Sequence, residues 1–239
     1  MRDSIPLIRL TETDSTQDAA RALLRQQAAP FVVSATQQTG GYGRQARAWE
    51  HLPSNLAATW AFPAPEDPLH ITHLGYLGCL ALRSALITLG IQPDRLSSKW
   101  PNDMLLDGVK MAGILVETAE KTVLFGLGVN ITAAPTVPGR AATCLRDAGY
   151  AEITADALLA ALSNTFAKQF TRLEQLGAAA LRADWLSSAA YLGETLRADT
   201  PQGVRIGRFL GLDISGRICL DNQVYSSADI TRARVLEGV

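Results

Sequence analysis

Residues 99–117, KWPNDMLLDGVKMAGILVE, contain the features that decide the fold of the surrounding chain. Pro101 has no backbone N–H, so strand pairing should stop there. Asn102 and Asp103 follow at once, a polar pair placed where a loop leaves a sheet. The dipeptide Asp107-Gly108 then predicts a tight hairpin turn.

The residues after this turn, 109–117, predict a buried strand. Lys110 stands near its start and Gly113 in its middle. A lysine at the mouth of an apolar strand is placed to point its cation into a cleft, and a glycine within a strand often marks close approach of a ligand or another backbone. Glu117 closes the run as a candidate counter-charge. A solvent-exposed lysine on an edge strand and an ordinary turn would give the same sequence. These residues alone therefore support a functional and a purely structural interpretation equally.

Two segments of this stretch resemble a known enzyme family. Residues 99–103 match the KWPND signature of biotin protein ligases, and residues 110–117 are similar to the K-x-(A/G)-G-I-L-x-E strand that follows it in that family. A run with Trp, Pro and Asn in fixed order is a specific signal, and a second signal at the right separation strengthens it. The resemblance implies that Lys99 and Asn102 contact ATP or the adenylate.

A glycine- and arginine-rich segment, residues 38–49 (QTGGYGRQARAW), follows a predicted strand. Its glycines let the backbone approach a ligand and turn N–H groups toward phosphate oxygens. Arg44 and Arg47 add charge-assisted donors suited to a polyphosphate. No Gly-Lys-Ser/Thr run follows, so the segment is not a Walker A loop.

The same segment resembles the Q-T-x-G-R-G-R-x-G-R-x-W loop of biotin protein ligases. Tyr42 stands where that loop has its first arginine and so supplies no guanidinium. Ala46 replaces the third glycine of the motif, and we expect it to stiffen the loop. The matching residues, to which the resemblance assigns ligand contacts, are Gln38, Gly41, Gly43, Arg44, Arg47 and Trp49.

The start of the first predicted helix is a second candidate ligand site. Ser15 is followed three residues later by Asp18, which has the form of a capping box, and this pattern alone favours a plain N-cap. A helix N-terminus also binds polar ligands. In biotin protein ligases a D-S-T-N segment at this place contacts the biotin ureido ring. This chain has Asp14-Ser15-Thr16-Gln17, so the resemblance assigns Ser15 and Thr16 to biotin.

Residues 122–130 predict a glycine-bearing strand that pairs with residues 109–117 in an antiparallel hairpin. Gly126 and Gly128 leave space beside Asn130. A core strand that happens to contain glycine is the plain structural interpretation. The segment also resembles the G-x-G-x-N of biotin protein ligases, which lines the adenylate pocket, and the resemblance assigns Asn130 to the adenylate.

The order of the predicted elements gives an α/β fold, a mixed, largely antiparallel sheet with helices on one face. Apolar residues at helical spacing predict helices over residues 69–89, 154–176 and 178–187. From about residue 191, short β patterns follow one another and resemble the small SH3-like C-terminal barrel of the family. We therefore expect a catalytic domain over residues 1–190 and an SH3-like domain over residues 191–239.

Composition restricts the class of protein and its partners. The chain has 239 residues, is 47% hydrophobic and carries a net charge of −1, which favours neither nucleic acid nor membrane as a partner. Three separated cysteines match no disulfide framework, so we expect a cytoplasmic protein with reduced thiols. His70 and His73 have no third ligand near them, so we expect surface histidines and no metal site. The predicted catalytic strands begin near residue 5, so we expect no DNA-binding domain; monomer and homodimer stay open.

The resemblance implies a two-step reaction that uses ATP, biotin and Mg²⁺. The carboxylate of biotin attacks the α-phosphate of ATP to give biotinyl-5′-AMP, and the amine of one lysine on a biotin carboxyl carrier domain, of the acetyl-CoA carboxylase type, then takes the biotinyl group. Two anions meet in the first step, so we expect Lys110 and Arg44 to act in catalysis by offsetting their repulsion. Asp103 is the third catalytic candidate and would position or deprotonate the carrier lysine.

These assignments predict two sets of contact residues. Around biotin we expect Ser15, Thr16, Gln38, Gly41, Tyr42, Gly43, Arg44, Lys110 and Gly113. Around ATP or the adenylate we expect Arg44, Arg47, Trp49, Lys99, Asn102 and Asn130.

Two other classes of protein are alternatives. Lipoate and octanoate protein ligases share the fold, but their R-R-x-x-G-G-G motif is absent here and KWPND is present. A non-catalytic biotin-sensing regulator is expected to lack Lys110 or to carry a DNA-binding domain, whereas Lys110 is present.

We predict that residues 40–49 are mobile without ligand and ordered with it, because their small residues add little packing and their two arginines repel each other until phosphates arrive. Trypsin should cut after Arg44 and Arg47 quickly in the ligand-free protein and slowly with biotin plus ATP. Equal cleavage in both states, with adenylate shown to be bound, would mean that these residues are not a lid.

Overall fold

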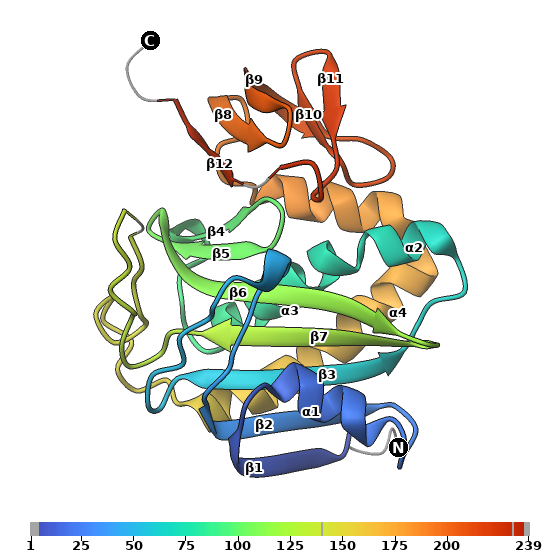
Figure 1. The fold of residues 1–239 in the computed structure, drawn as a ribbon, viewed down its shortest axis with the longest axis vertical. Helices are drawn as coiled ribbons and strands as arrows, with labels where there is room; N and C mark the ends of the chain where they lie inside the picture. Colours follow the sequence, from blue (N-terminus) through green and yellow to red (C-terminus); the bar gives the residue numbers. More distant parts are fainter. Residues whose placement is uncertain (1–4, 140, 231, 237–239) are drawn as a thin grey trace.

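The computed structural model describes residues 5–139, 141–230 and 232–236, which form two β-sheets with flanking helices (Figure 1). The larger sheet has seven strands in the order β1-β2-β3-β7-β6-β5-β4. Its strands are β1 (Leu7–Thr13), β2 (Phe31–Gln38), β3 (Leu56–Pro63), β4 (Leu96–Lys99), β5 (Asp103–Leu106), β6 (Val109–Ala119) and β7 (Thr122–Val129). The helices are α1 (Thr16–Leu23), α2 (Pro68–Thr72), α3 (Leu74–Thr88) and α4 (Ala155–Ser187). The predicted α/β class is confirmed.

The larger sheet is mixed and largely antiparallel, as predicted. β1 runs parallel to β2, to which α1 connects it, and the other neighbouring strands are antiparallel. Asp107 and Gly108 have φ angles of 51° and 77°. Both central residues of the β5–β6 turn are therefore left-handed, which is the conformation that a type I′ hairpin turn requires.

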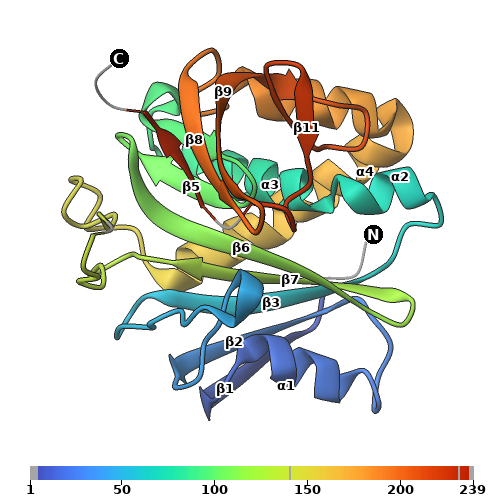
Figure 2. The same ribbon diagram turned by 45° about the horizontal axis from the view of Figure 1, so that its top comes forward.

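Helices cover both faces of the sheet, whereas we predicted helices on one face (Figures 1 and 2). α3 and α4 pack on the face where Trp60 and Phe125 enter the main core. α1 packs on the other face, over Phe31 and Leu124. The cause lies in strands such as β2, where residues 31–35 are all buried. A strand without a solvent face needs a cover on both sides.

The predicted helix over residues 69–89 is interrupted at His73, between α2 and α3. His73 is fully buried, and its ring centroid lies 5.7 Å from that of Tyr76. Our expectation of a surface histidine is therefore wrong at His73, because the break between the helices turns its ring into the core. Gly177, with a φ of 76°, interrupts α4 where we predicted one helix to end and another to begin. None of the described helices is long and apolar enough to span a membrane.

The smaller sheet has five strands in the order β11-β10-β9-β8-β12. They are β8 (Thr195–Thr200), β9 (Gly203–Leu212), β10 (Ile218–Leu220), β11 (Gln223–Tyr225) and β12 (Arg232–Val235). In the described part of the chain no ladder joins β11 to β12, so an open antiparallel sheet stands where we predicted a barrel. β10 and β11 are the shortest of the described strands of this sheet, with three residues each. A domain boundary near residue 190 stays a proposal.

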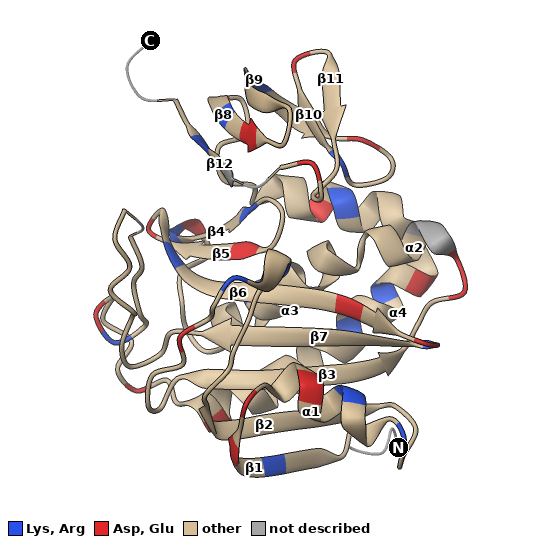
Figure 3. Cartoon of the chain, viewed as in Figure 1, with Lys and Arg blue, Asp and Glu red and all other residues tan. Residues whose placement is uncertain are grey.

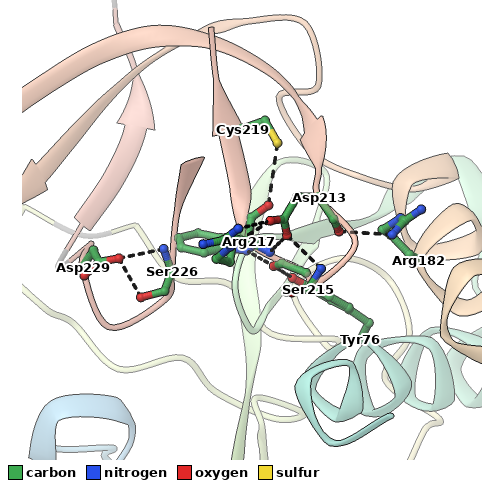
Figure 4. A network of polar contacts seen from close by, with 10 residues as sticks. Tyr76, Arg182, Asp213, Ser215, Arg217, Cys219, Ser226 and Asp229 are labelled. Atoms are coloured by element: carbon green, nitrogen blue, oxygen red, sulfur yellow. Dashed lines mark hydrogen bonds and ion pairs between the residues drawn. The ribbon is translucent and has the colours of Figure 1, made fainter. Parts of the chain in front are cut away.

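A turn of the smaller sheet, Asp213–Gly216, fixes the junction between the two sheets (Figure 4). The carbonyl of Gly216 accepts hydrogen bonds from the hydroxyl of Tyr76 on α3 and from the indole N–H of Trp100, the latter at 3.5 Å. Arg182 on α4 donates to the carbonyl of Asp213 at 3.2 Å. These bonds attach the smaller sheet to α3, to α4 and to Trp100, the residue that precedes Pro101.

Phe209 of β9 is almost fully buried in the core that contains residues of α3 and α4, whereas Val204 of the same strand is exposed. We predict that Phe209→Ala lowers the free energy of unfolding of the whole chain by about 3–5 kcal/mol, because it leaves a cavity in a shared core. The control Val204→Ala should change it by less than about 0.5 kcal/mol. Thermal unfolding followed by circular dichroism and tryptophan fluorescence should show one shifted transition. An early transition seen by only one signal would show that the smaller sheet unfolds independently.

Candidate active site

A cavity of about 410 Å³ lies between the first turn of α1, the loop before β3, strands β4 to β7 and the smaller sheet. Its volume is within the range of small-molecule sites. Gly41 and Asn130, although predicted as contact residues, are not among its lining residues. The predicted site residues that do line it are Ser15, Thr16, Gln38, Tyr42, Gly43, Arg44, Arg47, Trp49, Lys99, Asn102, Asp103, Lys110 and Gly113.

The first turn of α1 presents a fixed set of polar groups. The hydroxyl of Ser15 accepts the backbone N–H of Gln17 at 3.2 Å, so Ser15 is the predicted N-cap. Thr16 donates its backbone N–H and its hydroxyl to Oε1 of Gln38, at 2.9 and 3.2 Å. Thr59 on β3 donates to the hydroxyl oxygen of Thr16 at 3.0 Å. We did not predict Thr59, because a buried threonine in a strand carries no sequence signal of a site.

Gln17 lines the cavity, and we did not predict it as a site residue although it is the fourth residue of the segment that starts at Asp14. Its Nε2 donates to Glu117 at 3.0 Å, and Arg21 pairs with the same carboxylate at 2.7 Å. A Cβ at Gly126 would lie 2.6 Å from Oε1 of Gln17, so the glycine makes room for this side chain. Glu117 is therefore a counter-charge for α1.

The charged centre of the cavity is the pair formed by Lys110 and Asp103. Nζ of Lys110 lies 2.5 Å from Oδ1 of Asp103, and the two side chains are 37% and 20% exposed. Nζ also lies 5.4 Å from the ring centroid of Trp49. Basic and acidic positions gather around β4, β5 and the start of β6 in Figure 3. The lysine is thus paired within the protein but still reachable by a ligand.

Two residues of the KWPND segment flank this pair. Nζ of Lys99 lies 5.9 Å from the ring centroid of Tyr191, another lining residue. Nδ2 of Asn102 donates to the carbonyl of Ile114 at 2.6 Å, and the N–H of Ile114 donates back to the carbonyl of Asn102 at 2.9 Å. This exchange fixes Asn102 against β6 at the edge of the cavity.

Residues 41–49 form a small hairpin, called here the arginine hairpin. The N–H of Gly43 donates to the carbonyl of Arg47, and the N–H of Trp49 to that of Gly41, each at 2.8 Å. A Cβ at Gly41 would lie 2.6 Å from the carbonyl oxygen of Trp49 and 2.2 Å from Nε2 of Gln38. Gly41 therefore lets the chain cross closely at the base of the hairpin.

The tip of the arginine hairpin is strained and charged. Ala46 has a φ of 54°, a left-handed conformation that costs an L-residue about 1–2 kcal/mol. The guanidinium of Arg44 donates to the backbone carbonyl of Ser227, between β11 and β12. Burial, and then repulsion from Arg47, lower the pKa of Arg44 from its usual value. An anion beside both arginines would relieve this repulsion.

The indole of Trp49 lies on a floor of two glycines that face each other on neighbouring strands. Gly113 on β6 pairs with Gly128 on β7. A Cβ at Gly128 would lie 2.2 Å from Cε2 of Trp49, and one at Gly113 would lie 3.1 Å from Cζ3. Glycine is therefore needed at position 128 to hold the ring in this place.

Asn130 is buried behind the lining residues. Its Nδ2 donates to the carbonyl of Thr143 at 3.1 Å, and its N–H donates to the carbonyl of Met111 at 2.9 Å. The first bond joins the end of β7 to the segment that supplies the lining residues Gly139 and Ala141, and the second joins it to β6. A direct contact between Asn130 and the adenylate stays a prediction.

The family of this chain is shown by comparison with known sequences. The model described as "Biotin/lipoate A/B protein ligase family" matches residues 7–132. The chain is 34% identical over 236 residues to a biotin–acetyl-CoA-carboxylase ligase of Paracoccus denitrificans, with 92% of this chain and 98% of that protein covered. It is 32% identical to the bifunctional ligase/repressor BirA of Bacillus subtilis, with 90% and 70% covered. The chain belongs to the biotin/lipoate A/B protein ligase family.

Solved structures share the fold. A biotin protein ligase from Aquifex aeolicus in complex with biotin and ATP superposes with a TM-score of 0.83 at 22% identity, over 97% of this chain and 99% of that one. A biotin acetyl coenzyme A carboxylase synthetase from Helicobacter pylori superposes with a TM-score of 0.67 at 24% identity, over 92% and 99%.

We predict that Gly128→Ala displaces Trp49 from its floor, because the added methyl group would overlap the indole. The other three tryptophans are buried, so acrylamide quenching should report mainly on Trp49 and should increase in the variant. The control Gly75→Ala places its Cβ no nearer than 3.9 Å to a neighbouring atom outside its own helix and should leave quenching unchanged. Equal quenching in Gly128→Ala and the wild type would contradict this placement of Trp49.

Proposed function

We infer that this protein is an ATP-dependent biotin protein ligase, which forms biotinyl-5′-AMP and transfers biotin to a lysine of a biotin carboxyl carrier domain of the acetyl-CoA carboxylase type. The observation that carries this inference is the Lys110–Asp103 pair, which lies in one cavity with the arginine hairpin and the first turn of α1. Two relatives that align over 98% and 79% of their own length are biotin–acetyl-CoA-carboxylase ligases, which supports biotin over lipoate.

The first step joins two anions, so its barrier contains their repulsion. An oxygen of the biotin carboxylate attacks the α-phosphorus of ATP, the bond to the bridging oxygen breaks, and pyrophosphate leaves with that electron pair. Lys110 would exchange part of its contact with Asp103 for contacts with the incoming carboxylate and the α-phosphate. Its charge would stabilise the negative charge that develops between these two groups in the transition state more than it stabilises the separate substrates. Arg44 and Arg47 would bind the phosphates. Burial and then repulsion from Arg47 lower the pKa of Arg44, and the phosphate charge would offset both effects.

The polar groups at α1 suit the neutral head of biotin. Ser15, Thr16 and Gln38 combine hydroxyl and amide groups, which donate and accept hydrogen bonds as a ureido ring requires. Thr16 and Gln38 are bonded to each other, and Ser15 accepts the N–H of Gln17. These bonds fix the orientation of the three side chains before the ligand arrives, so little side-chain entropy is lost on binding. Trp49 would pack near the adenylate, where Lys99 and Asn102 also line the cavity.

The second step needs a neutral lysine amine from the carrier domain. The amine nitrogen attacks the acyl carbon, AMP leaves with the electron pair of the broken acyl–oxygen bond, and the nitrogen loses a proton. Asp103 would position this amine or accept its proton. Its carboxylate is the one acid among the lining residues in the described part of the chain.

Mg²⁺ fits this site as a companion of ATP. Among the described residues no three His, Cys, Asp or Glu side chains gather into a metal site. Mg²⁺ commonly takes most of its ligands from phosphate oxygens and water, with one or two carboxylates. Asp103 is the residue that would supply a carboxylate, and the ion would neutralise phosphate charge.

We predict that Lys110→Ala lowers biotin-dependent pyrophosphate release more than about 100-fold, the scale for one strong transition-state donor. Thermal unfolding should stay close to that of the wild type, because the side chain is partly exposed. Lys121→Ala, at the exposed β6–β7 turn, is the matched control and should release pyrophosphate normally. Near-wild-type release by Lys110→Ala would rule out the assigned role. Release by the wild type with lipoate but not with biotin would overturn the proposed function.

A further inference from the structure

Tyr42 connects the arginine hairpin to α1 through its side chain. Its hydroxyl donates to Oδ1 of Asp18 at 2.9 Å. Tyr42 lines the cavity, whereas Asp18 is exposed and is not a lining residue.

Along the chain, the Tyr42 bond lies between hydrogen-bonded attachments at the base and at the tip of the hairpin. At its base, Thr39 donates its N–H to the carbonyl of Thr13 at 3.0 Å and its hydroxyl to Asp14 at 2.9 Å. At its tip, Arg44 contacts the smaller sheet. The base bonds fix where the hairpin begins, and the Tyr42 bond holds its first arm against α1.

The chemistry of the pair favours the hydrogen-bonded hairpin over the open one. Burial, followed by the hydrogen bond to Asp18, raises the pKa of Tyr42 to about 12, so the phenol keeps its proton and stays a donor. A hydrogen bond from a hydroxyl to a carboxylate is stronger than one between neutral groups. The neighbouring charges, Arg21 and Glu117, pair with each other at 2.7 Å.

We propose that Tyr42 and Asp18 form a latch that holds the arginine hairpin closed over the cavity and slows the loss of biotinyl-5′-AMP between the two steps. Asp18 is a positioning residue, because it acts on the ligand only through Tyr42. The inference rests on the proposed function, since the latch has this use only if an adenylate forms beneath the hairpin.

The test compares variants at both ends of the bond. Asp18→Ala removes the acceptor, Tyr42→Phe removes the donor and keeps the ring, and Asp18→Asn keeps an acceptor oxygen as the conservative rescue. Asp156→Ala is the matched control, because Asp156 also lies in the first turn of a helix and pairs with Arg9 at 2.6 Å. It shares the helix-end charge of Asp18 and lies outside the cavity lining.

Two rates are measured. The first is trypsin cleavage after Arg44 and Arg47 in the ligand-free protein, and the second is release of labelled biotinyl-5′-AMP into solution without a carrier. We expect both to rise about two- to tenfold in Asp18→Ala and in Tyr42→Phe, the effect of one hydrogen bond. The double variant should match the single ones, because both changes remove the same contact. Asp18→Asn should approach the wild type, and Asp156→Ala should equal it.

Each outcome bears on a different statement. Unchanged cleavage in Asp18→Ala and Tyr42→Phe would overturn the latch. Faster cleavage with unchanged release would overturn its role in retaining the adenylate. Faster cleavage in Asp156→Ala as well would show a general loosening of the fold and would also overturn the latch. A wild-type protein that forms no adenylate with biotin and ATP would overturn the proposed function, while its cleavage rates would still decide whether the latch exists.

Discussion

The contact between Lys110 and Asp103 is the interaction on which the site depends. A cation half removed from water needs a counter-charge when no ligand is bound, and Asp103 supplies it from the next strand. At a separation of about 4 Å and an effective dielectric constant near 20, one pair of unit charges interacts by about 4 kcal/mol. A ligand carboxylate and phosphate offer Lys110 interactions of the same size. The lysine can therefore turn from Asp103 to the reacting groups at small net cost.

The strands around this pair are built to leave space above it. Gly113 and Gly128 face each other across β6 and β7 and accommodate the Trp49 ring, and Gly126 accommodates Gln17. Side chains at these three positions would fill the cavity floor. The roof comes from distant parts of the chain, because Arg44 reaches Ser227 and the smaller sheet shares a core with the larger one. Packing of the smaller sheet is thus part of how the site is closed.

Local sequence chemistry predicted the parts of the fold that depend on few neighbours. The turn at Asp107-Gly108, the N-cap at Ser15 and the break at Gly177 each follow from the conformations that their own residues allow. The resemblance placed the KWPND segment and the glycine-rich loop in one site, and most of their predicted contact residues line one cavity.

Features that depend on tertiary packing escaped prediction. α1 covers the second face of the sheet, and the His73 ring points into the core. Both depend on contacts with distant parts of the chain, which the local sequence pattern does not show. Asn130 makes hydrogen bonds to Thr143 and Met111, which the sequence did not indicate, and its predicted contact with the adenylate stays a prediction. Gln17 and Thr59 join the polar group at α1 through contacts between residues more than 40 positions apart.

The proposed function requires that this cavity activates biotin and passes it to one lysine of a carrier domain. Intact-protein mass spectrometry of a biotin carboxyl carrier domain, incubated with the protein, ATP and equal concentrations of biotin and lipoate, tests it most directly. We expect a single added biotinyl group, located by peptide mapping on one lysine and absent when ATP is omitted. A lipoyl group in its place, or an unmodified carrier domain with active protein and ATP present, would contradict it.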